Sequence, residues 1–99
     1  MKVSIQSVGF TADKKLIDFT EKKLGKLSDY MDRIVEVEVF FRVENISDKE
    51  NKITEVKVLV PGKDIVVKKQ CKSFEEGVDL TQDVLKRQLI KYKEKVAAK

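Results

Sequence analysis

Apolar and polar residues alternate with a period of two in four segments of the chain, and this alternation is typical of strands with one buried face. The predicted strands cover residues 2–8, 35–43, 53–60 and 63–71. The second is the clearest, because valine or phenylalanine occupies every odd position from 35 to 43 while most even positions carry a charge. Pro61 and Gly62 separate the last two segments, which predicts a hairpin.

Two other segments carry apolar residues at spacings of three and four, which is the pattern of an amphipathic helix. The first covers residues 13–31, and either Asp13 or Thr11 can cap its start. Gly25 lies inside it at a cost of about 1 kcal/mol relative to alanine, so it is either a point of close approach or a tolerated defect. The second helix begins at Ser73, where the sequence SFEE fits a capping box.

The predicted elements follow one another in the order β-α-β-β-β-α. A helix between the first two strands predicts a right-handed crossover, which makes these strands parallel if they are neighbours. The polar loop over residues 45–52 and the later Pro-Gly turn predict antiparallel pairing for the remaining strands. We therefore expect an α+β fold, a two-layer sandwich in which both helices cover one face of a four-stranded mixed sheet.

The chain has 99 residues, so we expect a single domain over residues 1–99. Charged residues make up 38% of the chain, which predicts a surface dense in charge. The net charge is +4, with +2 over residues 1–33, −3 over 34–55 and +5 over 56–99. This asymmetry favours an anionic partner that meets one face of the protein, although an ordinary soluble basic protein is the alternative.

Catalytic chemistry has little support in the sequence. Histidine is absent, and the single Cys71 lies in an apolar strand position, so neither an enzyme nor a cysteine–histidine metal site is expected. The glycines are scattered, and we predict no cofactor and no small-molecule substrate. One cysteine, no signal peptide and no membrane-spanning stretch together indicate the cytoplasm, and the role of Cys71 stays open.

The basic end of the second helix is the main candidate for binding. Residues 86–99 carry six basic side chains and one acidic one. Such a helix can neutralise phosphates of structured RNA through its charge and shape, or it can be an ordinary solvated helix. Membrane binding is less favoured, because the apolar stripe is needed to cover the sheet. Phe40, on the open sheet face, is the one aromatic candidate for stacking on a base, and a dimer contact is the alternative role for this ring.

Two segments carry a family resemblance. They are KLGKLSDYMDRI at residues 23–34 and FEEGVDLTQDVLKRQLIKYKEK at residues 74–95. With both in register, the chain resembles the short ribosome hibernation promoting factors, also called protein Y or ribosome-associated inhibitor and described as sigma-54 modulation proteins. The resemblance extends from end to end and implies the same β-α-β-β-β-α order.

The resemblance implies a function in translation regulation. Members of this family bind the small ribosomal subunit between its head and body, where they overlap the sites of messenger RNA and of the transfer RNA anticodon arms. They thereby inhibit translation and preserve idle ribosomes in starvation or stationary phase. The implied partner is 16S ribosomal RNA, and we expect a monomer off the ribosome.

The family's basic positions can be transferred to this sequence residue by residue. The candidate RNA-binding residues are Lys23, Lys26, Lys86, Arg87, Lys91, Lys93 and Lys95. Lys68, Lys69 and Lys72 are weaker candidates, because no family pattern matches them.

Two departures from the family pattern affect the expected function. We expect no C-terminal dimerisation domain of the kind that long members carry, and the sequence does not decide whether ribosome dimers are promoted or opposed. The outer face of the second strand is acidic, with Glu36, Glu38 and Glu44, and we expect that side to avoid RNA. A general binder of structured RNA and a protein-binding modulator of transcription are the alternative functions.

Overall fold

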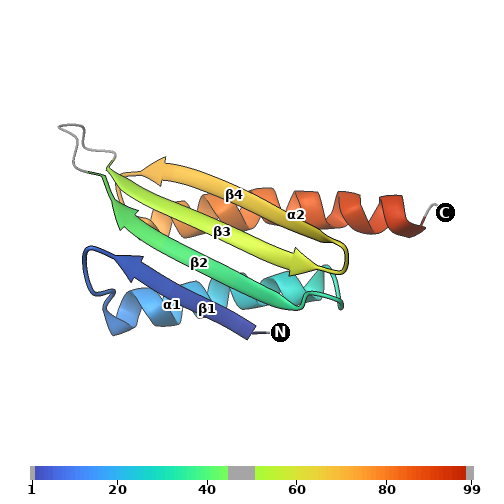
Figure 1. Ribbon diagram of the computed structural model, residues 1–99, viewed down its shortest axis with the longest axis horizontal. Helices are drawn as coiled ribbons and strands as arrows, with labels where there is room; N and C mark the ends of the chain where they lie inside the picture. The colour runs from blue at the N-terminus through green and yellow to red at the C-terminus, as the bar shows by residue number, and fades with distance from the viewer. Residues whose placement is uncertain (1, 45–50, 98–99) are drawn as a thin grey trace.

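The strands and helices follow the order expected from the sequence (Figure 1). The computed structural model describes residues 2–44 and 51–97, without the side chains of the last two, so most of the expected loop 45–52 lies outside the described residues. The elements are β1 (Lys2–Val8), α1 (Lys14–Gly25), a 3-10 helix η1 (Lys26–Asp29), β2 (Glu36–Val43), β3 (Lys52–Val60), β4 (Lys63–Cys71) and α2 (Phe74–Ala97).

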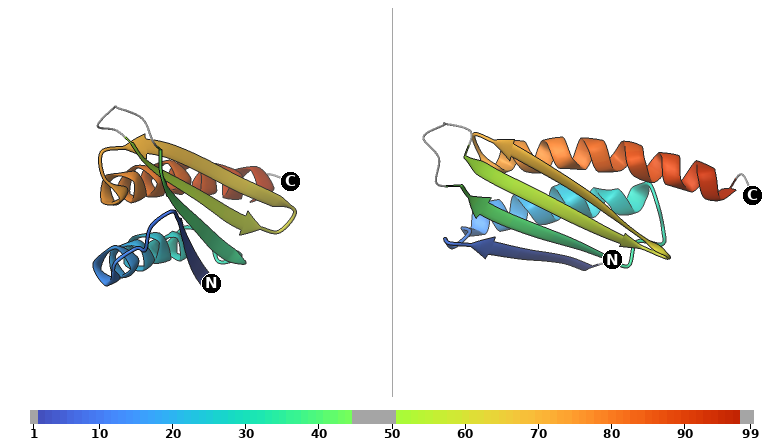
Figure 2. Two further views of the ribbon diagram at one scale, coloured as in Figure 1. Left: turned by 60° about the vertical axis from the view of Figure 1, so that its left-hand side comes forward. Right: turned by 45° about the horizontal axis from the view of Figure 1, so that its top comes forward.

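The four strands form one mixed sheet in the order β1-β2-β3-β4. β1 is parallel to β2, and the two later pairs are antiparallel. Both helices lie on the same face of this sheet, as the two views of Figure 2 show. The predicted α+β two-layer sandwich is therefore confirmed, including the parallel pair made by the first crossover.

The core lies between the helices and the inward-facing residues of the strands. Phe41 is completely buried on β2, as its strand phase predicted, while its neighbour Phe40 lies on the opposite face. Phe74, the first residue of α2, packs between Phe41 and Phe10, with ring centroids 4.9 Å apart in each pair. These aromatic contacts connect the start of α2 to both β2 and the β1–α1 connection.

The first helix is shorter than the sequence indicated. A helix over residues 13–31 was expected, but α1 ends at Gly25 and a 3-10 turn follows. Glycine weakens the α-helix there, and the Ser28 hydroxyl donates a hydrogen bond to the Gly25 carbonyl, 2.9 Å away. Leu27 and Met31 remain buried beyond the end of α1, so the apolar stripe continues although the α-helix does not.

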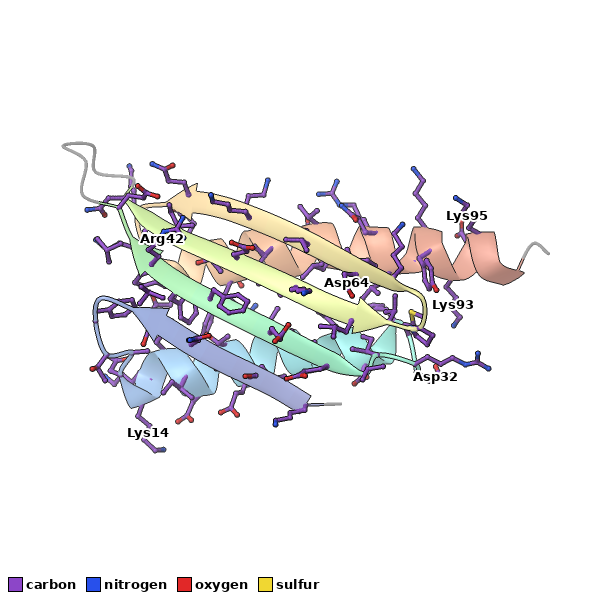
Figure 3. All side chains as sticks on the ribbon, in the orientation of Figure 1. Lys14, Asp32, Arg42, Asp64, Lys93 and Lys95 are labelled. Carbon is purple, nitrogen blue, oxygen red and sulfur yellow. The ribbon has the colours of Figure 1, made fainter. Side chains whose placement is uncertain are left out.

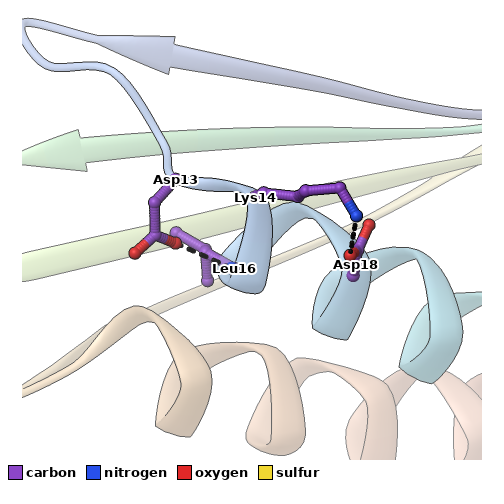
Figure 4. A network of polar contacts seen from close by, with 4 residues as sticks. All are labelled: Asp13, Lys14, Leu16 and Asp18. Atoms are coloured by element: carbon purple, nitrogen blue, oxygen red, sulfur yellow. Dashed lines mark hydrogen bonds and ion pairs between the residues drawn. The ribbon is translucent and has the colours of Figure 1, made fainter.

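Side-chain caps fix where both helices begin. At α1 the Asp13 carboxylate accepts a hydrogen bond from the Leu16 backbone N–H at 2.8 Å, which decides between the two candidate caps (Figure 4). At α2 the Ser73 hydroxyl accepts from the Glu76 backbone N–H at 3.1 Å. The reciprocal bond of the capping box differs from expectation, because the Glu76 carboxylate accepts from the Lys72 N–H.

Gly77 is the point where α2 lies closest to the sheet. A Cβ placed at Gly77 would clash with the Oγ1 of Thr54 and would lie 2.9 Å from its Cβ. A Cβ placed at Gly25 meets nothing within 4 Å among the described residues, so that glycine marks no close approach of the protein to itself. The position that requires glycine is therefore in α2, where the residue pattern does not single it out.

Candidate nucleic-acid interface

The predicted basic residues all lie in the helical layer, which covers one face of the sheet. α1 and α2 lie side by side, and the last turns of α2 project beyond the β3–β4 hairpin (Figures 1 and 2). The basic residues of α2 lie on the turns alongside and beyond this hairpin, and most of them are exposed to solvent. A large binding partner can therefore reach these side chains without rearrangement of the fold.

Lys23 differs from the other predicted residues because it connects the two helices. Its Nζ lies 3.0 Å from the Asp79 carboxylate on α2 and 5.8 Å from the centroid of the Phe19 ring. Lys26, at the start of η1, is exposed and forms no ion pair with any described carboxylate. Of the two predicted lysines in the first helical segment, Lys26 is therefore the one whose charge is not neutralised.

Arg87 is also paired within the protein. Its guanidinium lies 3.1 Å from the Asp83 carboxylate, one turn earlier in α2. Both side chains are about two-thirds exposed, at 69% and 66%, so solvent screens the pair and its net contribution to stability is small. A phosphate can compete for Arg87, but Asp83 reduces the local positive potential.

Lys86 and Lys93 lie on the side of α2 that faces α1 and η1. The Nζ of Lys86 lies 5.1 Å from the centroid of the Tyr30 ring, within the range of a cation–π contact. Lys93 lines a shallow hollow with Tyr30, Ile90, Asp29 and Glu94. Tyr30 follows η1 directly, so the helix exit that carried the family resemblance also supplies the aromatic ring beside these lysines.

Lys91 and Lys95 lie on the opposite side of α2, beside the β3–β4 hairpin. Figure 3 shows Lys93 and Lys95 leaving the helix in different directions. Lys91 and Lys95 line a second hollow together with Lys63 of β4 and Tyr92. Ile65 and Gln88 complete its lining. The sequence did not single out Lys63, although its place directly after the Pro-Gly turn could have indicated that it lies at the hairpin end.

The charges that remain unpaired decide the electrostatics of this surface. Within the described residues, no carboxylate lies within 4 Å of the ammonium groups of four residues on α2, namely Lys86, Lys91, Lys93 and Lys95. These four therefore provide the strongest uncompensated positive charge on α2. The structure brings the predicted residues onto one layer. The predicted lysines on α2 are divided between two sides of that helix.

The outer face of the sheet is less acidic than the sequence indicated. Glu36 and Glu38 do lie there, but Lys57 lies directly opposite Glu38, and Glu44 pairs with Arg42 at 3.3 Å. Over the four strands this face carries as many bases as acids, namely Lys2, Arg42, Lys57 and Lys68 against Glu36, Glu38, Glu55 and Asp64. The prediction was correct for β2 alone, but basic residues on the neighbouring strands balance the acidic charge of β2.

Phe40 lies on this open face, as predicted, but it is not an isolated ring. It lines a shallow hollow with Val8, Ile53, Arg42 and Glu55, and Ile53 is only 3% exposed although no described helix covers it. The ring thus packs within a small apolar cluster. Cys71 is buried at the end of β4.

The part of the chain that the structure describes gives little support to a metal site or to a membrane-spanning helix. No group of three or more histidine, cysteine, aspartate or glutamate side chains is arranged to hold a metal ion there. No described helix is long and apolar enough to cross a membrane. We call the helical layer with its unpaired lysines, Lys26, Lys86, Lys91, Lys93 and Lys95, the basic layer. It carries the most distinctive chemistry of the described surface.

Comparison with known proteins decides the family. The model of the family described as "Sigma 54 modulation protein / S30EA ribosomal protein" matches residues 3–97. The chain belongs to this family. The resemblance seen in the sequence is confirmed. One name of the family describes a modulator of sigma 54, the other a ribosomal protein, and neither describes an enzyme.

Curated members of the family carry a consistent name. The ribosome hibernation promoting factor of Azotobacter vinelandii is 34% identical over 95 residues, which cover 96% of this chain and 85% of that protein. The ribosome hibernation promotion factor of Bacillus subtilis (strain 168) is 31% identical over 101 residues, which cover all of this chain but 52% of that protein. The chain thus spans about half the length of the Bacillus relative.

Solved structures of the family share the fold. A ribosomal subunit interface protein from Coxiella burnetii matches with a TM-score of 0.83 and 29% identity, over 95% of this chain and 99% of that one. The N-terminal domain of Thermus thermophilus Protein Y matches with a TM-score of 0.75 over 92% of this chain, and at 22% identity this likeness concerns the fold alone.

Proposed function

We propose that the protein is a ribosome hibernation factor that binds the small ribosomal subunit in the decoding channel and inhibits translation in starvation or stationary phase. It would occupy the sites of messenger RNA and of the transfer RNA anticodon arms, and it would work in the cytoplasm without chemical catalysis. The observation that carries this proposal is the set of unpaired lysines on the C-terminal half of α2, in a chain that belongs to this family.

The proposed mechanism is electrostatic attachment of a rigid body. Lysine side chains neutralise phosphates and release counterions, which gives affinity that falls as salt increases. The helices pack on a common core and the Lys23–Asp79 ion pair connects them at the surface, so the basic layer keeps its shape mainly through the core. Specificity would come from the fit of this layer to folded 16S ribosomal RNA, because lysine contacts with phosphates carry no sequence information.

Reversing the charges of Arg87 and Lys91 on α2 tests this mechanism. We expect Arg87→Glu with Lys91→Glu to weaken binding to small subunits at least tenfold and to reduce the slope of log affinity against log salt by about 2, roughly 1 for each phosphate that is no longer neutralised. Analytical sedimentation with isolated subunits at several salt concentrations measures both quantities.

A matched control comes from the other end of the helical layer. Lys14→Glu with Lys15→Glu makes the same change in net charge at the exposed start of α1, and we expect it to alter binding much less. Equal losses in the two double variants would mean that net charge, and not this surface, governs binding. Equal binding to a plain RNA duplex would instead favour the general RNA-binding alternative, and a salt-independent protein partner would favour modulation of transcription.

A further inference from the structure

The hollow between the β3–β4 hairpin and the last turns of α2 combines charge with a fixed shape. We call it the hairpin hollow, and it is lined by Lys63, Ile65, Gln88, Lys91, Tyr92 and Lys95. Two of these residues come from β4 and four from α2. The sheet layer thus contributes a basic residue to a site that otherwise belongs to the helical layer.

A hydrogen bond between distant parts of the chain fixes the geometry of the hairpin hollow. The Tyr92 hydroxyl donates to the Pro61 carbonyl at 3.0 Å, which connects α2 to a turn 31 residues earlier. The Nζ of Lys63 lies 5.8 Å from the centroid of the same tyrosine ring. The hydrogen bond therefore connects the turn to the ring before any ligand arrives, and Lys63 lies within cation–π range of the same ring.

The hairpin hollow is positive and lacks an acidic side chain. Its three ammonium groups, from Lys63, Lys91 and Lys95, form no ion pair with the described carboxylates. Asp64 is next to Lys63 in sequence, but it lies on the outer sheet face and approaches Lys57 at 3.6 Å. The hollow beside Tyr30 differs in this respect, because Asp29 and Glu94 line it.

We propose that the hairpin hollow binds a phosphate group of the RNA backbone, with Lys63 as the ligand contributed by the sheet. The ammonium groups of the three lysines that line this hollow repel one another, and a phosphate bound there would offset that repulsion. The Gln88 amide can donate a further hydrogen bond to a phosphate or ribose oxygen. This inference rests on the proposed function and adds the hairpin to the interface.

Removing the charge of Lys63 tests the inference. We expect Lys63→Gln to weaken binding to small ribosomal subunits by roughly fivefold, and to reduce the slope of log affinity against log salt by about 1. The matched control is Lys2→Gln, the same change on the outer sheet face of β1, which should leave both quantities unchanged. Lys63 is exposed, and thermal unfolding of each variant checks that the fold is kept.

A second variant tests the geometry of the hairpin hollow without changing its charge. Tyr92→Phe removes the hydrogen bond to Pro61 and leaves every charge in place, so affinity should fall about twofold while the salt slope stays as in the wild type. If Lys63→Gln binds as the wild type does, the hairpin hollow is not part of the interface. If the wild type itself does not bind small subunits, the proposed function fails, whatever the variants do.

A free phosphate ion is the other source of the same ligand chemistry. Inorganic phosphate, titrated at constant ionic strength, should not displace the protein from small subunits at millimolar concentration if the occupant is the RNA backbone. Displacement of the wild type but not of Lys63→Gln would overturn that assignment and would make the hairpin hollow a site for free phosphate.

Discussion

At the scale of single residues, two glycines in helical segments have opposite roles. Gly77 allows α2 to lie directly on β3, and its nearest neighbour is the buried Thr54 hydroxyl, for which the described residues offer no hydrogen-bond partner. Gly25 ends α1 in open space. The sequence shows both as glycines in helical patterns and cannot separate them, because the difference depends on which surface each one faces after folding.

Alanine substitution should therefore change stability in opposite directions at the two positions. We expect Gly77→Ala to lower the free energy of unfolding by about 1–3 kcal/mol, because the added methyl group forces α2 away from Thr54. Gly25→Ala should raise it by up to about 1 kcal/mol, because alanine favours the helix and meets no neighbour. Urea unfolding of both variants measures the difference, and a shift of the same sign in both would contradict the packing described for α2.

Ion pairs are a second feature at this scale, because they determine which of the predicted basic residues keep an uncompensated charge. Lys23 and Arg87 were selected with the other basic residues, yet each has a carboxylate within about 3 Å, at 3.0 and 3.1 Å. The Arg87 partner lies four residues earlier on the same helix, a spacing that the sequence displays. The Lys23 partner lies on the other helix, and only the packing of α1 against α2 brings them together.

At the scale of elements, the strands were easier to predict than the first helix. A period of two has no competing interpretation over residues 36–43, and the strand pairing follows from the short connections. The stripe through Leu24, Leu27 and Met31 is misleading, because the spacing of three between Leu24 and Leu27 suits a 3-10 turn as well as an α-helix. All three side chains are buried, so burial explains the pattern without specifying the backbone.

The start of α1 provides a test at the level of one element. Asp13→Ala removes the acceptor for the Leu16 N–H and should lower the free energy of unfolding by about 1 kcal/mol. Thr11→Ala is the matched control, since Thr11 was the other candidate cap and makes no side-chain hydrogen bond among the described residues. Thermal or urea unfolding compares them, and an equal loss in both would mean that Asp13 is not the effective cap.

At the scale of the whole molecule, charge is divided between the two layers. The outer sheet face balances acids with bases across its strands, whereas the C-terminal half of α2 keeps four lysines without described carboxylate partners. The basic run was visible in the sequence, and so was its place on a helix that covers the sheet. Its division between the Tyr30 side and the hairpin side was not visible, because it depends on how α2 crosses the hairpin.

The central claim concerns where on the ribosome this basic layer binds. A rigid body in the decoding channel must exclude messenger RNA and transfer RNA, while a body bound elsewhere need not. The decisive measurement is sedimentation of the protein with vacant ribosomes and with ribosomes loaded beforehand with messenger RNA and initiator transfer RNA. We expect binding to vacant ribosomes and its loss on the loaded ones, whereas equal binding to both would contradict the decoding-channel account.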